Sequence, residues 1–418
     1  MLDQIEGSRG VAQAVALCRP QVICAYPITP QTHIVEDLGA MVKGGTLANC
    51  EFINVESEFA ALSVAIGSSA TGARSYTATA SQGLLFMAEA VYNASGLGLP
   101  IVMTVGNRAI GAPINIWNDQ SDSMALRDAA WIQLYAESNQ QAVDVHIQAF
   151  RIAETLSLPV MVCMDGFILT HAFEGIDVPT QEQVDGFLPP YEPRQILDPN
   201  EPISLGAMVG PEAFTEVRYL AHYKQMQALD LIPQIAAEFQ QCFGRESGGL
   251  IATYRNDDAE TIVITLGSVI GTVEEVIDEM RDQGHAIGAV TLRAFRPFPH
   301  AALIAAIGGA KRVVVLEKSL AVGMGGIVSN NVHMTLHGSQ LPIYSVIAGL
   351  GGRPITRKSL RELFLRAMRD DLERTEFLDL KTTIVKRELE REQQLTRPGS
   401  TAENILREMG VVDAAKTA

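Results

Sequence analysis

The chain has 418 residues, a hydrophobic fraction of 47% and a formal net charge of −16 at pH 7. This length predicts two domains, and the negative charge argues against nucleic acid or an anionic membrane as a partner. The five cysteines form no CxxC pair, so zinc and iron–sulfur spacings are absent, and no apolar run reaches the length of a membrane span. We therefore expect a cytoplasmic protein without a metal site of its own.

Strand-like and helix-like segments alternate through the first half of the chain. Continuous apolar runs predict strands at 21–26, 52–55, 74–80, 99–106, 133–137 and 158–166. Helical periodicity predicts helices at 11–18, 31–42, 56–70, 81–96 and 143–157. Continuous apolar strands are buried on both faces, so this alternation predicts an α/β domain with a parallel sheet and helices on both faces.

The remaining chain divides into three stretches. From about residue 176 the sequence is rich in proline and acids, which predicts a long irregular crossing that ends in a helix near 237–245. Strands and helices alternate again from 261 to 352, which predicts a second α/β domain. We place the domains at 1–250 and 255–370, followed by a charged tail at 371–418 that either forms helices on another subunit or is solvated.

Polar residues follow four strands of the first predicted sheet. "YPITPQT" (26–32) follows the first strand, "ESE" (56–58) the second, "SQG" (81–83) the third, and "NRAIG" (107–111) the fourth. Ligands of open parallel sheets bind outside the carboxyl ends of the strands. A threonine, carboxylates, a Ser-Gln-Gly turn and an arginine at this edge suit a small anion and one protonatable ring nitrogen.

Five ordered motifs carry a family resemblance that covers about residues 5 to 365. "YPITPQT", "NVESEFAA", "TATASQGL", "GNRAIGAPINIWND" and "WIQLYAESNQ" resemble the alpha subunit of the 2-oxoacid:ferredoxin oxidoreductases, with the pyruvate branch (pyruvate synthase) matching best. The resemblance implies a thiamine-diphosphate-enzyme pyrimidine-binding domain followed by a transketolase-C-terminal-like domain. It also implies the oxidation of pyruvate with coenzyme A and ferredoxin to acetyl-CoA and carbon dioxide, in either direction, as in carbon fixation.

The resemblance assigns roles that local reasoning alone does not. Glu58 would hydrogen-bond the aminopyrimidine ring of thiamine diphosphate as the catalytic carboxylate, although a helix N-terminus also favours an acid. Thr29 and Arg108 would bind the substrate, although a threonine there also suits a helix cap and the arginine a surface ion pair. Pro27, Ser81, Gln82 and Gly83 would contact the cofactor, and a serine N-cap with a turn glycine is the alternative for the last three.

Other residues depart from the family pattern or add little to it. Gln120 stands where relatives usually have a histidine, which leaves the identity of the oxoacid open. Asp119 and Asp122 suit structural roles in their loop. Two glycine-rich stretches, 321–326 and 349–353, lack the context of a dinucleotide fingerprint and suit tight turns. A contact between a coenzyme A phosphate and Arg293 or Arg296 is an alternative to a purely structural role for their loop.

The chain contains no Gly-Asp-Gly motif, with which thiamine enzymes begin their magnesium and diphosphate site. The resemblance therefore implies that a beta subunit binds the diphosphate and Mg²⁺. It also implies gamma and ferredoxin-like delta subunits, with [4Fe-4S] clusters on these partners. The same chemistry on 2-oxoisovalerate or 2-oxoglutarate is the nearest alternative. A non-catalytic scaffold and an NAD-dependent enzyme are alternatives from other classes.

Overall fold

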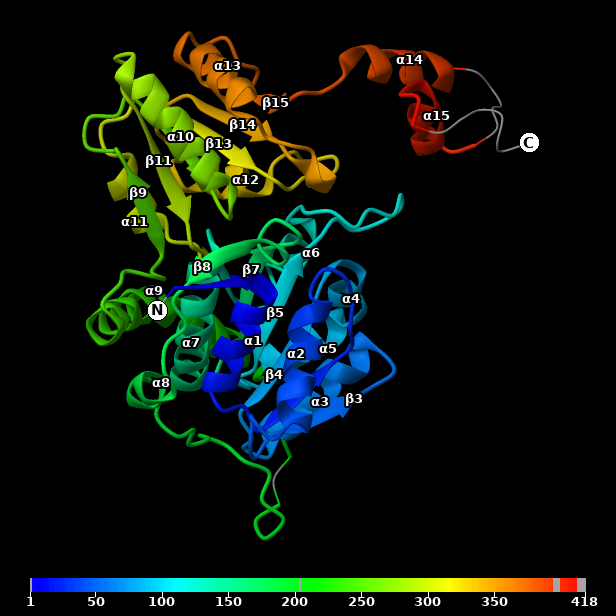
Figure 1. Ribbon diagram of the computed structural model, residues 1–418, viewed down its shortest axis with the longest axis vertical. Coiled ribbons are helices and arrows are strands. Elements are labelled where there is room, and N and C mark those ends of the chain that lie inside the picture. The colour runs from blue at the N-terminus through cyan, green and yellow to red at the C-terminus, as the bar shows by residue number, and fades with distance from the viewer. Residues whose placement is uncertain (1, 203, 394–398, 412–418) are drawn as a thin grey trace.

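A computed structural model describes residues 2–202, 204–393 and 399–411. Seven of its strands form one sheet in the order β12-β6-β7-β5-β4-β2-β3 (Figure 1). Strands β2 to β7 run parallel, whereas β12 is antiparallel to β6. The bounds are β2 (Val22–Ala25), β3 (Glu51–Asn54), β4 (Ser75–Thr79), β5 (Val102–Asn107), β6 (Ile132–Tyr135), β7 (Val160–Asp165) and β12 (Ala294–Arg296).

Helices cover both faces of this sheet, as the sequence predicted. One face packs against α1 (Gly7–Leu17), α2 (Thr32–Lys43) and α7 (Asn139–Leu156), with α9 (Phe214–Phe243) outside α7. The other face packs against α3 (Glu58–Ala70), α4 (Ser81–Phe86) and α5 (Ala88–Gly96). The central strands β4, β5 and β7 are buried throughout, which explains their continuous apolar sequences.

A second sheet has the order β15-β14-β13-β10-β11-β9, and only β9 runs antiparallel to its neighbour. Its strands are β9 (Ile251–Tyr254), β10 (Thr261–Thr265), β11 (Ile287–Leu292), β13 (Arg312–Glu317), β14 (Ile343–Ile347) and β15 (Thr375–Phe377). Helices α10 (Val269–Asp282) and α13 (Arg357–Met368) cover one face, and α11 (His300–Ile307) and α12 (Ile327–Thr335) the other. The predicted α/β class is therefore confirmed for both sheets.

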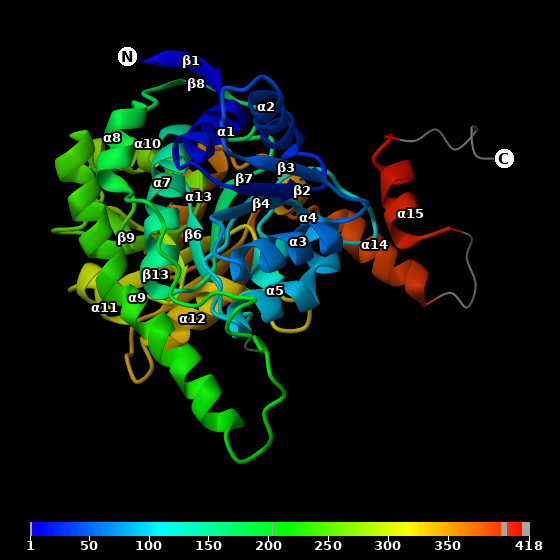
Figure 2. The same ribbon diagram turned by 90° about the horizontal axis from the view of Figure 1, so that it is seen from below.

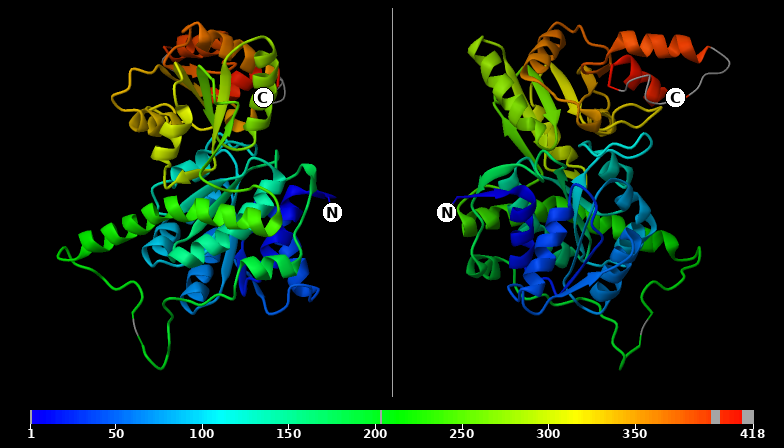
Figure 3. Two further views of the ribbon diagram at one scale, coloured as in Figure 1. Left: turned by 90° about the vertical axis from the view of Figure 1, so that its left-hand side faces the viewer. Right: turned by 45° about the vertical axis from the view of Figure 1, so that its right-hand side comes forward.

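The remaining elements lie around these two sheets. Figure 2 shows α14 and α15 projecting to one side, joined to each other by Arg387 and Arg391, which pair with Glu408. Figure 3 shows the N-terminal half of α9 extending away from the body. Among the described residues, no helix has both the length and the apolarity that crossing a bilayer requires. The smaller elements are β1 (Asp3–Glu6), β8 (Phe173–Ile176), α6 (Ser121–Ala125), α8 (Gln181–Phe187), η1 (Leu350–Gly352), α14 (Thr382–Glu392) and α15 (Thr401–Glu408).

The structure corrects two local predictions. The single helix expected at 81–96 is two helices, because the backbone at Met87 (φ −90°, ψ 11°) separates α4 from α5. The helix expected near 237–245 begins at Phe214, inside the predicted irregular crossing, and Pro233 lies within it. All five cysteines are free, and four of them are buried, whereas Cys242 is exposed.

Candidate active site

The first sheet has a topological switch point between β2 and β4. The connection through α2 leads from β2 outward to β3, whereas the connection through α4 and α5 leads from β4 to β5 on the other side. A crevice forms outside the carboxyl ends of two such strands, and it is the usual place for a ligand in an open α/β sheet. Thr29 lies just beyond β2 and Ser81 just beyond β4, with Glu58 and Arg108 beyond the adjacent strands β3 and β5.

Arg108 and Thr29 are in direct contact across this crevice. The Arg108 Nη1 donates a hydrogen bond to the Thr29 carbonyl oxygen (2.9 Å), and Nε donates to the Asn115 carbonyl oxygen (3.1 Å). These bonds fix the guanidinium, while Nη2 has no partner among the described residues and is free to bind an anion. Burial lowers the pKa of Arg108, and the nearby Asp122 opposes that shift. Thr29 itself is exposed.

Asp122 joins the two loops that carry Ser81 and Arg108. Its Oδ2 accepts hydrogen bonds from the backbone N of Ser81 (2.9 Å) and of Arg108 (3.0 Å). Its Oδ1 accepts from Asn107 Nδ2 (2.8 Å) and from the backbone N of Ser123 (2.8 Å). Burial raises the pKa of Asp122 to about 7, although these four donors act in the opposite direction. Asp122, for which the sequence suggested a structural role, thus connects the loops that follow β4 and β5.

Glu58 lies against Gly83 and Thr79. It is the first residue of α3, whose N-cap Ser57 accepts a hydrogen bond from the backbone N of Ala60 (3.2 Å). A β-carbon built on Gly83 would lie 2.7 Å from Glu58 Oε1 and 2.7 Å from Thr79 Oγ1. The absence of a side chain at Gly83 therefore lets the carboxylate approach the turn. The side chain of Glu58 is only 9% exposed and has no hydrogen-bond partner among the described residues.

The other predicted contact residues lie around the same turn. Ser81 is fully buried in a left-handed conformation (φ 49°), and its Oγ donates to the Ala109 carbonyl oxygen (2.5 Å). That conformation is unfavourable for a residue with a side chain and is typical of functional turns. Gln82 is half-buried, with Nε2 3.5 Å from the Gly111 carbonyl oxygen, and Pro27 is exposed. Ser81 therefore shapes the loop, while Gln82 and Pro27 are accessible to solvent.

Gln120 lies at the contact between the two sheets. Its Nε2 is 3.2 Å from Asp165 Oδ1 and 3.4 Å from the Leu266 carbonyl oxygen. Burial alone would raise the pKa of Asp165, but Lys318 Nζ, 2.6 Å from Oδ2, and Ser268 hold it below its ordinary value. No described hydrogen bond joins Gln120 to Thr29, Glu58 or Arg108. Within this chain, the Gln120 side chain takes part in the contact between the two sheets.

The second domain adds its strand exits to this contact. Lys318 follows β13, and Ser268 follows β10, so the carboxyl edges of the two sheets face each other. The glycine-rich turn after β14 meets the loop after β5, where the Gly351 backbone N donates to Asp119 Oδ2 (3.1 Å). A β-carbon on Gly352 would lie 2.5 Å from the Trp117 Cβ, so this turn needs glycine for close packing. The tight-turn interpretation accounts for this stretch.

The residues suit the ring of a thiamine cofactor. The hydroxyl Oγ1 of Thr79 is buried without a hydrogen-bond partner among the described residues, and the Glu58 carboxylate beside it is also unpartnered. A buried hydroxyl left unsatisfied in this way is costly unless a ligand engages it. A carboxylate and a hydroxyl beside a bare glycine turn can bind the nitrogen atoms of a flat heterocycle. Glu58 was identified from the sequence by resemblance, whereas nothing in the sequence singled out Thr79.

Comparisons with known proteins show the family of the chain. Residues 13–237 match the family described as "Pyruvate flavodoxin/ferredoxin oxidoreductase, thiamine diP-bdg", and residues 259–360 match "Pyruvate:ferredoxin oxidoreductase core domain II". A pyruvate synthase subunit PorA from Methanosarcina barkeri is 47% identical over 86% of this chain and 90% of its own length. A ketoisovalerate oxidoreductase subunit VorA from Pyrococcus abyssi is 39% identical over 86% of this chain and 91% of its own.

A solved structure shares the fold at lower identity. The 2-oxoglutarate:ferredoxin oxidoreductase from Magnetococcus marinus, solved with 2-oxoglutarate, coenzyme A and succinyl-CoA, superposes with a TM-score of 0.67 at 19% identity. The alignment covers 89% of this chain and 65% of that chain. At this identity the match supports the arrangement of both sheets and not the substrate.

Proposed function

Because this chain belongs to the pyruvate flavodoxin/ferredoxin oxidoreductase family, we propose that it is the alpha subunit of a pyruvate:ferredoxin oxidoreductase (pyruvate synthase). In the reaction, the bond between the keto carbon and the carboxylate of pyruvate breaks and carbon dioxide leaves. A thioester bond forms to coenzyme A, two electrons pass to ferredoxin, and one proton is released. The observation that carries this proposal is the unpartnered Glu58 carboxylate beside Thr79 and Gly83, at the same sheet edge as Thr29 and Arg108.

Thiamine diphosphate, when bound, supplies the nucleophilic carbon that attacks the keto group and accepts the electrons left by decarboxylation. Glu58 would hold a proton between its carboxylate and a nitrogen of the aminopyrimidine ring, and Thr79 Oγ1 would hydrogen-bond the same ring. Gly83 would leave room for that ring, and Pro27 and Gln82 would contact its exposed side. Because the chain lacks a Gly-Asp-Gly motif, we assign the diphosphate and Mg²⁺ to a partner beta subunit.

Arg108 would bind the substrate carboxylate through its free Nη2, in a geometry that suits a planar anion. Two backbone carbonyl groups hold the guanidinium, so little side-chain entropy would be lost on binding. The Thr29 hydroxyl would donate to the keto oxygen or the carboxylate from the opposite loop. Asp122 would act through Ser81 and Arg108, as a positioning residue that keeps their two loops together.

A branched substrate, 2-oxoisovalerate, is the second candidate. The observation in its favour is the 39% identity to ketoisovalerate oxidoreductase subunits, close to the 42–47% found for pyruvate synthase subunits. The chemistry at Glu58 and Arg108 would be the same, because both oxoacids carry the same carboxylate and keto group. The difference would lie in the space beyond the keto carbon, to which a partner subunit can contribute.

Purification of this chain with its native partners tests the proposal. The expected complex contains a thiamine-binding beta subunit, and gamma and ferredoxin-like delta subunits that carry [4Fe-4S] clusters. It should reduce ferredoxin with pyruvate and coenzyme A at a higher kcat/KM than with 2-oxoisovalerate or 2-oxoglutarate. A complex that prefers 2-oxoisovalerate would favour the second candidate. A complex without thiamine-dependent oxoacid oxidation would support the scaffold alternative and refute both.

A further inference from the structure

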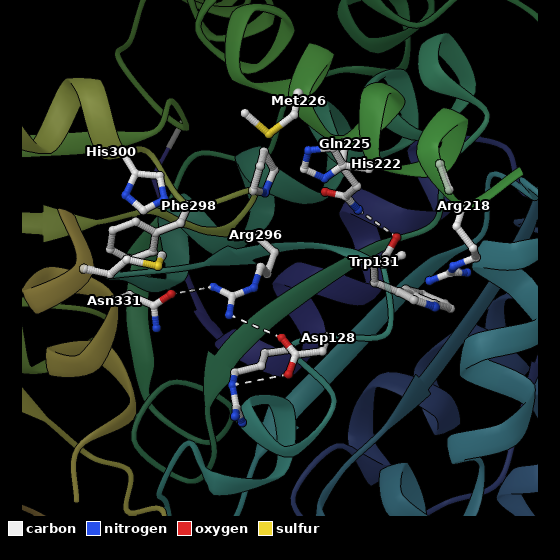
Figure 4. Close-up of a pocket in the computed structure, with 15 residues that line it drawn as sticks. Asp128, Trp131, Arg218, His222, Gln225, Met226, Arg296, Phe298, His300 and Asn331 are labelled. Atoms are coloured by element: carbon white, nitrogen blue, oxygen red, sulfur yellow. Dashed lines mark hydrogen bonds and ion pairs between the residues drawn. The ribbon is translucent and has the colours of Figure 1, made fainter. Parts of the chain in front are cut away.

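A second pocket lies away from the candidate active site. It has a volume of about 380 Å³ and opens between α9, the segment that precedes β6, the turn after β12, and α12 (Figure 4). We call it the basic pocket and define it by Arg127, Arg218, Arg296, Trp131 and Phe298. Trp131 directly precedes β6, so the pocket lies at the amino end of that parallel strand, whereas Thr29 and Arg108 follow the carboxyl ends of theirs. The two sites are therefore at opposite edges of the first sheet.

The charge of the basic pocket opposes that of the whole chain. Three guanidinium groups and one carboxylate, Asp128, line it, which leaves an excess of two positive charges in a chain of net charge −16. Each arginine comes from a different segment: Arg127 precedes β6, Arg218 is on α9, and Arg296 ends β12. Independent segments thus direct cationic groups to one cavity, which is the arrangement that binds phosphate groups.

The three guanidinium groups differ in the number of hydrogen-bond and ion-pair partners that they have within the chain. Arg296 Nη1 donates to Asn331 Oδ1 (3.2 Å), and its guanidinium carbon lies 4.5 Å from the centre of the Phe295 ring. Arg127 Nη1 donates to the Met124 carbonyl oxygen (2.7 Å), and Arg127 and Arg296 both pair with Asp128, at 3.8 Å and 3.5 Å. Arg218 has neither a hydrogen bond nor an ion pair with any described residue. Its five N–H donors are therefore available to a ligand, beside two arginines that are held in place.

The rest of the wall is apolar and aromatic. Trp131 is fully buried, with Nε1 bonded to the Val91 carbonyl oxygen (2.7 Å), so it forms a rigid base. Phe298 is 6% exposed and lies beside the His300 ring, with centroids 4.9 Å apart. Figure 4 shows Arg218, His222 and Met226 along α9, where residues four apart share one face. Rings and a methionine beside arginines suit a flat heterocycle attached to an anion.

We propose that the basic pocket binds an organic phosphate that carries an aromatic ring, the chemistry of an adenine nucleotide. The phosphate groups contact Arg218, Arg127 and the outer face of Arg296, and the ring lies against Phe298 and Met226. The cavity volume falls within the range of small-ligand sites. This proposal does not depend on the oxoacid chemistry, because it uses none of the residues assigned to that reaction.

Equilibrium dialysis of ADP with the assembled complex tests the proposal. The wild-type complex should bind one ADP per copy of this chain, and affinity should fall with added salt, as ion pairing requires. Arg218→Gln should weaken ADP binding about tenfold, the loss expected for one charge-assisted contact. The matched control is Arg357→Gln, which removes an exposed arginine on α13 that pairs with Glu279. Because Arg218 has no hydrogen-bond or ion-pair partner in the described part of the chain, its substitution should not disturb folding.

Two further ligands define the chemistry. Coenzyme A is added as a competitor, since it contains an adenine nucleotide portion. Displacement of ADP from the Arg218-dependent site would identify coenzyme A as the natural ligand. If coenzyme A does not displace ADP, the natural ligand is a free nucleotide. Inorganic pyrophosphate should bind more weakly than ADP, because it cannot use the aromatic wall. The proposal is overturned if the complex binds no ADP, if Arg218→Gln and wild type bind it equally, or if pyrophosphate binds as tightly as ADP.

Discussion

The Arg108 guanidinium donates a hydrogen bond to the backbone carbonyl oxygen of Thr29, across the switch point of the first sheet. One bond thus connects the exits of two strands, β2 and β5, that are not neighbours in the sheet, because β4 lies between them. The contact places a cationic fork beside an exposed threonine hydroxyl. It joins the two loops into one surface, which is the surface proposed to bind the substrate carboxylate.

Replacing Arg108 with lysine should raise the KM for pyruvate about tenfold while kcat changes less. A lysine keeps the charge but cannot donate to Thr29, Asn115 and a substrate at the same time. Steady-state kinetics of the assembled complex measure this effect, with Arg357→Lys as the control for an exposed arginine. An unchanged KM would remove Arg108 from the substrate site.

A methyl group at Gly83 should abolish most thiamine binding by this complex. The new carbon would lie 2.7 Å from Glu58 Oε1 and 2.7 Å from Thr79 Oγ1, so the carboxylate would have to move. Gly67→Ala in α3 is the matched control, because nothing lies within 4 Å of a β-carbon at that position. Isothermal titration with thiamine diphosphate should show lost binding for Gly83→Ala and normal binding for Gly67→Ala. Normal binding by both variants would contradict the assigned position of the ring.

Asp122→Asn should lower both stability and turnover. The amide has one acceptor oxygen, so its NH₂ group would face backbone N–H groups of Ser81 and Arg108 or the donors on the other side. Each buried donor left unpaired costs about 1–3 kcal/mol. We expect a lower midpoint of thermal unfolding and a lower kcat, neither of which should occur in Asp282→Asn, an exposed acid on α10. Wild-type kinetics in the Asp122 variant would show that the two loops do not depend on it.

Stability should decrease as the pH falls from about 6.5 towards 4, because of His146. Burial lowers the pKa of this imidazole to about 4, so the unfolded chain takes up the proton first and the folded chain loses stability as the pH falls. The loss should approach about 1.4 kcal/mol per pH unit between the two pKa values. Its Nδ1 donates to the Ala142 carbonyl oxygen (2.6 Å) and its Nε2 accepts from Thr104 Oγ1 (2.6 Å).

Thermal unfolding at several pH values checks this prediction. In His146→Gln the dependence on pH between about 4 and 6.5 should become shallower, because the titrating group is gone. His337→Gln should keep the wild-type dependence, since His337 is exposed. Equal slopes in all three proteins would show that His146 does not control acid stability.

The sequence predicted the strands of the first sheet, and the loops at their carboxyl ends, better than it predicted the contacts between those loops. Continuous apolar runs predict buried strands such as β5 and β7. Because these strands are parallel, the loops that follow them lie at the same edge of the sheet. Thr29, Glu58, Ser81 and Arg108 could therefore be gathered before the structure was known. Their pairing through Asp122 could not, because a loop acid carries no local sign of the donors that will surround it.

Long-range pairing explains the remaining differences. β12 joins the first sheet from the second half of the chain, with Ala294 opposite Leu134, and its three residues are too few to show a period. The first half of α9 was hidden because it exposes apolar side chains, including Phe214, Tyr219 and Tyr223, which blur the helical pattern. The resemblance marked Gln120 only as a departure from the family pattern, and its contact with the Leu266 carbonyl oxygen joins it to the second half of the chain, which no local pattern reveals.

The most direct test of the proposed function is the turnover of Glu58→Gln beside Glu56→Gln in the assembled complex. Glu58 is buried against Gly83, whereas Glu56, two residues earlier, is exposed, so the two substitutions make the same chemical change in different surroundings. If Glu58 holds the proton at the cofactor ring, Glu58→Gln should lower kcat for ferredoxin reduction by about 10²–10⁴-fold, and Glu56→Gln should leave it unchanged. Undiminished turnover in an intact, thiamine-loaded Glu58→Gln complex would contradict the account.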